Sequence, residues 1–142
     1  MKLSDIKINI NAVEKGDWVG DIPEMGDLRL RVRGTDNADY SALQDKLLRA
    51  ARRRNGNASR EQRDQITATL LLETVLLDWD GILDENNRPI PYSKDFAQTL
   101  LTDPEYRDFR MAVIWAADQV ARTESKVEES DRGNLLKLSI GS

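Results

Sequence analysis

The N-terminal part of the chain alternates apolar and polar residues in two places. Residues 6–10 alternate isoleucine with polar residues, and residues 28–33 alternate aliphatic residues with arginines. A period of two places the apolar side chains of a strand on one face and the polar side chains on the other. Glycine-containing turn sequences at 15–17 and 25–27 separate these segments. Residues 6–33 are therefore predicted to form a small antiparallel β-meander with one solvent-facing side.

Beyond residue 34 the apolar residues recur at helical spacing, and residues 38–122 are predicted to be helical. Each predicted helix has a recognisable start. The capping candidates are Thr35-Asp36-Asn37 for the first helix, and Ser59, Ser93 and Asp103 for the later ones. The helix behind Ser59 is predicted to run through Trp79 and to stop at Gly81. Its apolar arc is wider than one stripe, which indicates a central helix covered on more than one side.

Residues 123–142 combine many polar residues with a short apolar cluster. Leu135, Leu136, Leu138 and Ile140 form that cluster. Two interpretations stay open, a frayed tail or a segment that docks on its own domain or on a neighbour. The patterns together predict one domain over residues 1–142. Its class is α+β and mostly α, with the N-terminal meander packed on a bundle of about four helices.

The composition excludes most kinds of catalytic and metal-binding site. The chain contains no cysteine and no histidine, so thiolate chemistry, disulfides and histidine-based catalysis lack their residues. The acidic run from Asp78 to Glu85 does not have the spacing of a calcium loop, because Gly81 comes too early. We therefore expect no enzyme activity, no cofactor and no metal site. No apolar run approaches the roughly 20 residues of a membrane span, so we expect a cytoplasmic protein.

Charge is distributed unevenly along a chain whose net charge is −4. The segment 46–63 is strongly basic and the segment 78–85 is acidic. Separate patches of opposite sign can pair with a partner, or head to tail with a second copy, so we expect a homo-oligomer. The basic segment could also contact nucleic acid. The scarcity of aromatic residues near it and a pI of about 4.9 argue against that use.

Several short phrases, taken in order, resemble the tail assembly chaperones of long-tailed bacteriophages. They are Gly16-Asp17-Trp18-Val19, Gly26 to Gly34, Leu76-Leu77-Asp78-Trp79-Asp80-Gly81-Ile82, Ile90-Pro91-Tyr92-Ser93, and Asp103 to Phe109. The resemblance implies a mostly helical protein that binds the tape measure protein and helps recruit tail tube subunits. It also implies action in the host cytoplasm and absence from the mature virion. It supplies no catalytic residue.

A chaperone of this kind needs a surface that shelters apolar helices of its client. The candidate contact residues are Arg52, Arg53, Arg54, Trp79, Leu135 and Leu136. The default for Trp79, as for Trp18 and Trp115, is nevertheless packing in the core. Two alternatives to a chaperone remain. One is a structural tail or head–tail connector component that stays in the virion, and the other is a nucleic-acid-binding accessory protein.

Overall fold

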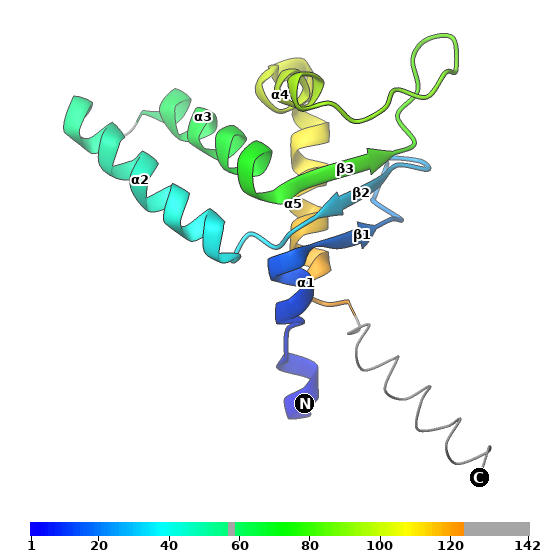
Figure 1. Cartoon of the computed structure of the whole chain (residues 1–142), viewed down its shortest axis with the longest axis horizontal. Helices are drawn as coiled ribbons and strands as arrows, with labels where there is room; N and C mark the ends of the chain where they lie inside the picture. Colours follow the sequence, from blue (N-terminus) through cyan, green and yellow to red (C-terminus); the bar gives the residue numbers. More distant parts are fainter. Residues whose placement is uncertain (57–58, 124–142) are drawn as a thin grey trace.

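A three-stranded antiparallel sheet lies at the centre of the protein, and a long helix crosses one of its faces (Figure 1). The computed structural model describes residues 1–56 and 59–123. The strands are β1 (Asp17–Val19), β2 (Arg29–Val32) and β3 (Leu76–Asp80), in the spatial order β1-β2-β3. The crossing helix is α5 (Arg107–Val120). The prediction of a mostly helical α+β fold is confirmed.

The other helical elements surround this centre. They are η1 (Leu3–Ile6), α1 (Ile10–Lys15), α2 (Ala38–Asn55), α3 (Arg60–Leu70), η2 (Leu71–Val75), α4 (Lys94–Thr102) and η3 (Pro104–Tyr106). The predicted starts are confirmed by their hydrogen bonds. The side chains of Asn37, Ser59 and Ser93 each accept a backbone N–H from the first turn of the helix that follows. Asp103 accepts the N–H of Glu105 in the same way, at the start of η3.

The core forms between the sheet and α5. Leu30 and Val32 of β2 are fully buried, while Arg29 and Arg31 beside them are exposed. The period-two pattern of this strand therefore separates a dry face from a solvent-facing one, as predicted. On the solvent-facing side the Arg29 guanidinium lies over the Trp18 ring, 5.5 Å from its centroid.

The predicted strand at residues 6–10 is wrong. Ile6 ends the 3-10 helix η1, and Ile10 begins α1. The Asn9 side chain accepts the N–H of Ala12 and so starts a helix at the point where the alternation would need extended chain. No described strand lies beside residues 6–10 to pair with them.

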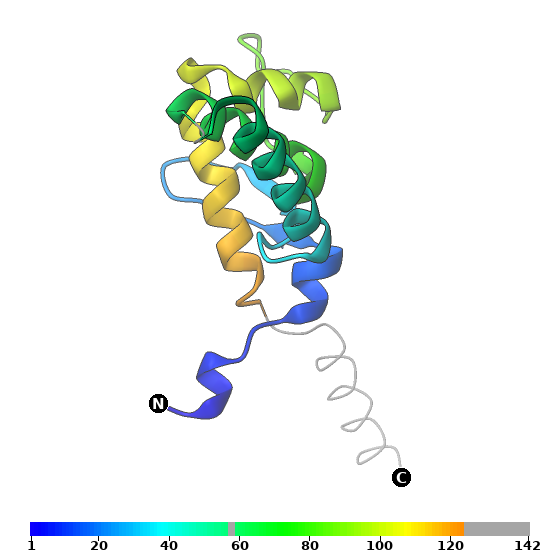
Figure 2. The same cartoon turned by 90° about the vertical axis from the view of Figure 1, so that its left-hand side faces the viewer.

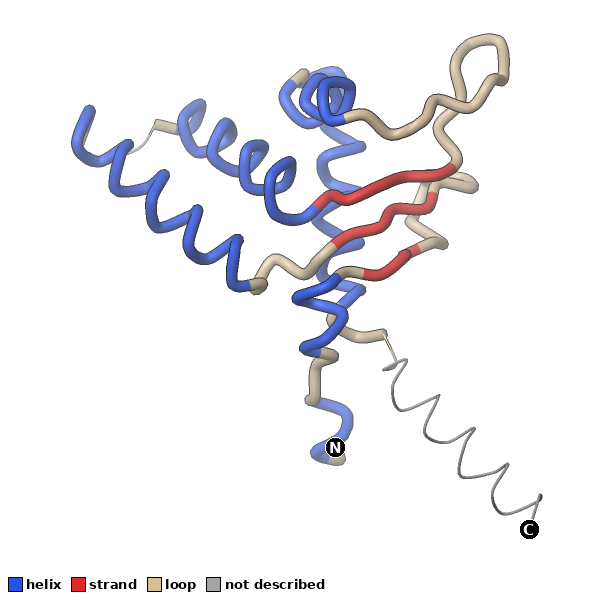
Figure 3. Tube along the Cα trace, viewed as in Figure 1, coloured by secondary structure: helices blue, strands red, loops and turns tan. Residues whose placement is uncertain are grey.

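The predicted helix from Ser59 to Trp79 is also wrong in its second half. It ends as α3 at Leu70, passes through the π-helical turn η2, and becomes strand β3 from Leu76 (Figure 3). An unbroken apolar run is compatible with a buried helix or a buried strand, so the periodicity did not decide between them. Pairing with β2 decides it, since Trp79 lies opposite Leu30 and Asp78 opposite Arg31.

Gly81 therefore follows a strand rather than ending a helix. Its φ of +93° lies in the left-handed region that favours glycine. A Cβ at this position would lie 2.7 Å from the carbonyl oxygen of Asp27. The glycine thus lets the chain leave β3 in close contact with the turn before β2.

The two outer strands share an Asp-Trp dipeptide. Asp17 in β1 accepts the backbone N–H of Trp18 at 2.8 Å, and Asp78 in β3 accepts that of Trp79 at 2.8 Å. Each aspartate carboxylate thus accepts one backbone N–H group of an outer strand. A further strand that paired with either outer strand would need that N–H group.

The helices α2 and α3 lie side by side and project away from the sheet (Figures 1 and 2). We call this pair the α2–α3 hairpin. None of residues 38–54 has a fully buried side chain, although the helix carries several leucines. The helix α2 is therefore covered on one side only.

Candidate protein-binding surfaces

The root of the α2–α3 hairpin is held firmly. Asn37 is buried, and its side-chain NH2 donates to the carbonyl oxygens of Gly34 at 2.7 Å and Thr74 at 2.9 Å. Its side-chain oxygen accepts the N–H of Tyr40 and caps α2. Nearby, the Arg33 guanidinium forms an ion pair of 2.8 Å with Asp39 in the first turn of α2. These contacts fix the direction in which α2 leaves the body.

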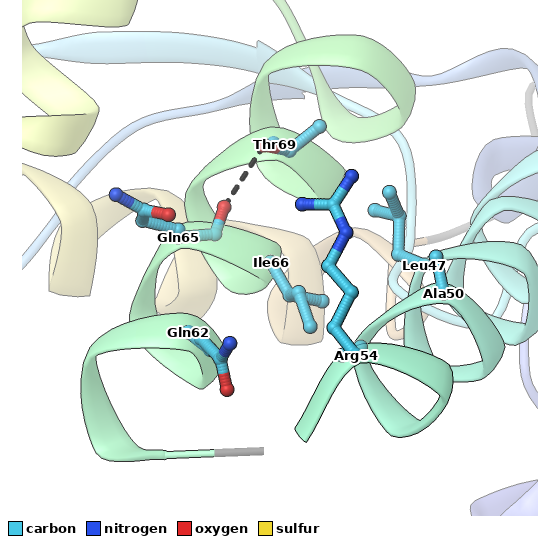
Figure 4. Close-up of a pocket in the computed structure, with 8 residues that line it drawn as sticks. Leu47, Ala50, Arg54, Gln62, Gln65, Ile66 and Thr69 are labelled. Atoms are coloured by element: carbon cyan, nitrogen blue, oxygen red, sulfur yellow. Dashed lines mark hydrogen bonds between the residues drawn. The ribbon is translucent and has the colours of Figure 1, made fainter. Parts of the chain in front are cut away.

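A groove of about 290 Å³ runs between the two helices of the hairpin. Its α2 side is mainly apolar, and its α3 side is mainly polar apart from Ile66. The residues are Leu47, Ala50, Ala51 and Arg54 of α2, and Gln62, Gln65, Ile66 and Thr69 of α3. Figure 4 shows the Arg54 side chain reaching along this α2–α3 groove between Ile66 and Leu47. An apolar α2 wall with Ile66 opposite and one cation above suits a helix that carries apolar, polar and acidic residues.

The hairpin also carries a basic rim. Arg52, Arg53 and Arg54 are exposed in the last turn of α2. Within the described ranges, none of the ion pairs involves a basic residue between Lys46 and Arg63. These charges are solvated and remain available to a partner. Sequence reasoning found these arginines, but it did not find the groove beside them, because the groove needs α3 at a particular distance from α2.

A second concave surface lies against helix α5. It is about 250 Å³ in volume and is formed by the turn before β2 together with α5. Its apolar lining is Ile22, Pro23, Met25, Met111, Ala112 and Trp115, and Glu24 and Asp108 stand at its edge. Met111 is 54% exposed. Methionine adapts its shape to different partners, so this Met–Trp groove is a second candidate.

Sequence reasoning missed the Met–Trp groove, although one signal pointed to it. Met111 and Trp115 lie four residues apart on α5, outside the stripe that faces the sheet. Residues four apart share a helix face. Large apolar side chains beyond the core-facing stripe therefore indicated a second apolar face.

Trp79 does not face a partner in this structure. It is 4% exposed, and its indole N–H donates to the carbonyl oxygen of Ile90 at 2.8 Å. Its ring makes edge contacts with Tyr92, Phe96 and Phe109 at centroid distances of 4.9, 5.9 and 6.0 Å. Trp79 therefore packs in the core, where it joins β3 to α4 and α5, and it has almost no exposed surface to offer a partner in this fold. Leu135 and Leu136 fall outside the described residues.

The acidic run after β3 forms a turn. The Asp84 carboxylate accepts the N–H groups of Asn86 and Arg88 at 2.8 and 3.0 Å. Among the residues that the structure describes, no three Asp or Glu side chains are grouped as metal ligands would be. In the same part of the chain, no helix is long and apolar enough to cross a membrane.

Three titratable groups have raised pKa values. The hydrogen bond of 2.7 Å from Lys94 to Glu73 raises the pKa of Lys94 and ties the start of α4 to η2. Burial raises the pKa of the Tyr40 hydroxyl, which lies at the root of α2, and that of the Tyr92 hydroxyl before α4. None of the three lines the α2–α3 groove or the Met–Trp groove.

Comparison with known proteins gives one match. The family model described as "YdaY prophage protein" matches residues 35–134. No match to the chain was found among curated proteins or among solved structures. The matched range includes the whole α2–α3 hairpin, β3, α4 and α5, and it begins after β2. The match covers well over half of the chain, so this bacteriophage-derived protein belongs to the YdaY prophage protein family.

Proposed function

We propose that the protein is a non-enzymatic phage tail assembly chaperone. In this role it binds apolar helices of the tape measure protein in the host cytoplasm and helps recruit tail tube subunits. It leaves before the virion is complete. The observation that carries the proposal is the α2–α3 groove, with its apolar α2 wall and basic rim.

The groove has the geometry of a receptor for a third helix. Two neighbouring helices leave a channel between their ridges, and a third helix fills such a channel in a bundle. Leu47 of α2, which lines the groove, is only half-buried. A docked helix would complete its burial, which contributes to the free energy of binding.

The charges around the groove indicate what the client helix carries. The basic residues near the tip of the hairpin make no ion pair within the described chain. A client helix with acidic residues beside its apolar stripe would meet them as it docks. Such charge pairs at the rim favour encounter and orientation more than affinity.

The family match supports the hairpin over the Met–Trp groove as the main site. The matched range contains both walls of the α2–α3 groove, whereas the Met–Trp groove takes half of its lining from residues 22–25, before that range. Membership in a prophage family supports a role in the phage life cycle. It is compatible with a tail assembly chaperone and also with a component retained in the tail.

The test is co-expression of the full chain with the tape measure protein of the same phage. We expect the client to become soluble with the wild-type protein and to precipitate with Ala50→Glu. Ala50 is exposed and lines the α2–α3 groove, so a charge there blocks docking without disturbing the core. The matched control is Met111→Glu, at an exposed position of the Met–Trp groove, which should keep full activity. Unchanged client solubility with the wild-type protein would reject the chaperone role.

Two further measurements separate the alternatives. Mass spectrometry of purified virions should lack this protein, since a retained tail or connector component would be present in them. Filter binding with nucleic acid at physiological salt should show no retention. Tight, salt-sensitive binding that Arg52→Glu with Arg53→Glu abolishes would instead assign the basic rim to phosphate contacts.

A further inference from the structure

Several exposed aliphatic side chains lie close together near the N-terminus. Leu3, Ile6, Ile8 and Ile10 are 79%, 61%, 48% and 59% exposed. We call residues 3–10 the N-terminal arm, and Figure 2 shows it leading away from the body. Single exposed aliphatic residues are ordinary, but a contiguous series of them marks a surface that something covers.

The root of the arm is joined to the end of α5. The backbone N–H of Asn9 donates to the carbonyl oxygen of Ala121 at 2.8 Å. The Asn9 side-chain NH2 donates to the carbonyl oxygen of Thr123 at 3.2 Å. Thr123, the last described residue, therefore lies against the root of the arm.

We propose that residues 135–140 of the same chain dock on the N-terminal arm and cover its isoleucines. In the sequence, Leu136, Leu138 and Ile140 alternate with Lys137 and Ser139. Ile6, Ile8 and Ile10 present exposed aliphatic side chains from the end of η1, from the link after it and from the first residue of α1. Burying these two sets of aliphatic side chains against each other would supply the free energy of docking.

The connecting chain is long enough for this contact. From Thr123 to Leu136 it can span about 20 Å as a helix and about 40 Å when extended. The arm from Asn9 back to Ile6 requires only about 10 Å. Because the connection starts at the root of the arm, its entropy cost is small and its effective concentration high.

Charge favours the same arrangement. The arm carries exposed Lys7, and exposed Lys2 directly precedes it. The one acid of the arm, Asp5, accepts the backbone N–H of Lys2 at 3.0 Å. The connecting segment is acidic on balance. Its acids are Glu124, Glu128, Glu129 and Asp131, against Lys126 and Arg132. Opposite charges therefore approach each other as the C-terminal residues fold back along the arm.

The absence of cysteine makes a cross-linking test clean. The full chain carrying Ile8→Cys and Leu138→Cys should form a disulfide within one chain under mild oxidation. It should form at least about tenfold faster than in a control pair, because docking raises the effective concentration of the two thiols. The control is Leu138→Cys with Gln98→Cys, an exposed position on α4. A second pair, Ile6→Cys with Leu138→Cys, tests whether residues 135–140 dock closer to the N-terminus of the arm.

The products decide between the possible occupants. An oxidised monomer with altered mobility on a non-reducing gel supports docking within the chain. Disulfide-linked dimers that form at micromolar protein would overturn it and assign the arm to a second copy. Cross-linking no faster than in the control, for both arm positions, would also overturn it.

Hydrogen exchange supplies an independent measurement. Amides of residues 135–140 should be protected in the wild-type chain and should exchange at least about tenfold faster in Ile6→Asp with Ile8→Asp, since protection scales with the docked population. Both isoleucines are exposed in the described fold, so this variant should still fold. Equal exchange in the two proteins would contradict the docking. None of these measurements involves a client, so their outcome is separate from that of the chaperone test.

Discussion

At the scale of single residues, Trp79 shows how a local motif acquires its role from distant parts of the chain. Its indole contacts Tyr92, Phe96 and Phe109, which come from the loop before α4, from α4 and from α5. It also donates to the carbonyl oxygen of Ile90. One side chain thus connects the sheet to both helices that follow it.

Replacement of Trp79 by alanine should be severely destabilising. We expect Trp79→Ala to lower the free energy of unfolding by about 3–5 kcal/mol, because a large cavity opens and a buried carbonyl loses its donor. Urea unfolding followed by far-UV circular dichroism measures this change. The matched control is Trp18→Ala on the solvent-facing side of the sheet, for which we expect a loss of about 1 kcal/mol. Equal losses for the two variants would show that the aromatic cluster is not central.

The capping residues, in contrast, could be predicted from the sequence alone. Asn37, Ser59 and Ser93 start helices because each side chain bonds to an N–H a few residues away. Such contacts need no information about the rest of the fold. The contacts of Trp79 span the chain from β3 to α5, and no local pattern encodes them.

At the scale of elements, both errors of the sequence prediction involve strands. A strand was expected at Ile6–Ile10, where Asn9 instead starts a helix, and a helix was expected where β3 forms. Strand formation depends on a partner strand, and β3 finds that partner in β2, far away in sequence. The periodicity of apolar residues shows which face of an element is apolar. It does not show which other segment of the chain lies beside that element.

The exit from β3 depends on the absence of a side chain at Gly81. We expect Gly81→Ala to cost about 2 kcal/mol or more, because a left-handed backbone and a clash with backbone atoms act together. Gly26→Ala is the matched control. Its φ of +56° is also left-handed, yet a Cβ there meets nothing within 4 Å, so we expect a loss of about 1 kcal/mol. Thermal unfolding of both variants would contradict this account if the two losses were equal.

At the scale of the whole molecule, the basic residues are concentrated on the hairpin, far from the acidic turn that follows β3. The sequence predicted the separation of charge, and with it Arg52, Arg53 and Arg54 as candidates. It did not predict that these residues would stand on a projecting pair of helices beside a groove. The position of α3 relative to α2 follows from tertiary contacts such as those of Asn37 with Gly34 and Thr74.

This charge distribution leads us to expect weak self-association. Sedimentation velocity should show a concentration-dependent increase in mass at low salt, and about 0.5 M salt should suppress it because screening shortens the range of the attraction. Arg52→Glu with Arg53→Glu should suppress it at low salt as well. A strict monomer over a wide range of concentration would reject the expectation.

The Asp-Trp dipeptides on the two outer strands set a limit on how such an association can grow. Each aspartate keeps a backbone donor of its strand occupied. Open sheet edges allow chains to add one after another without end, as in fibrils. With one donor of each outer strand occupied, we expect strand addition at the sheet edges to be disfavoured. We therefore expect the self-association of this protein to use its helix surfaces rather than its sheet edges.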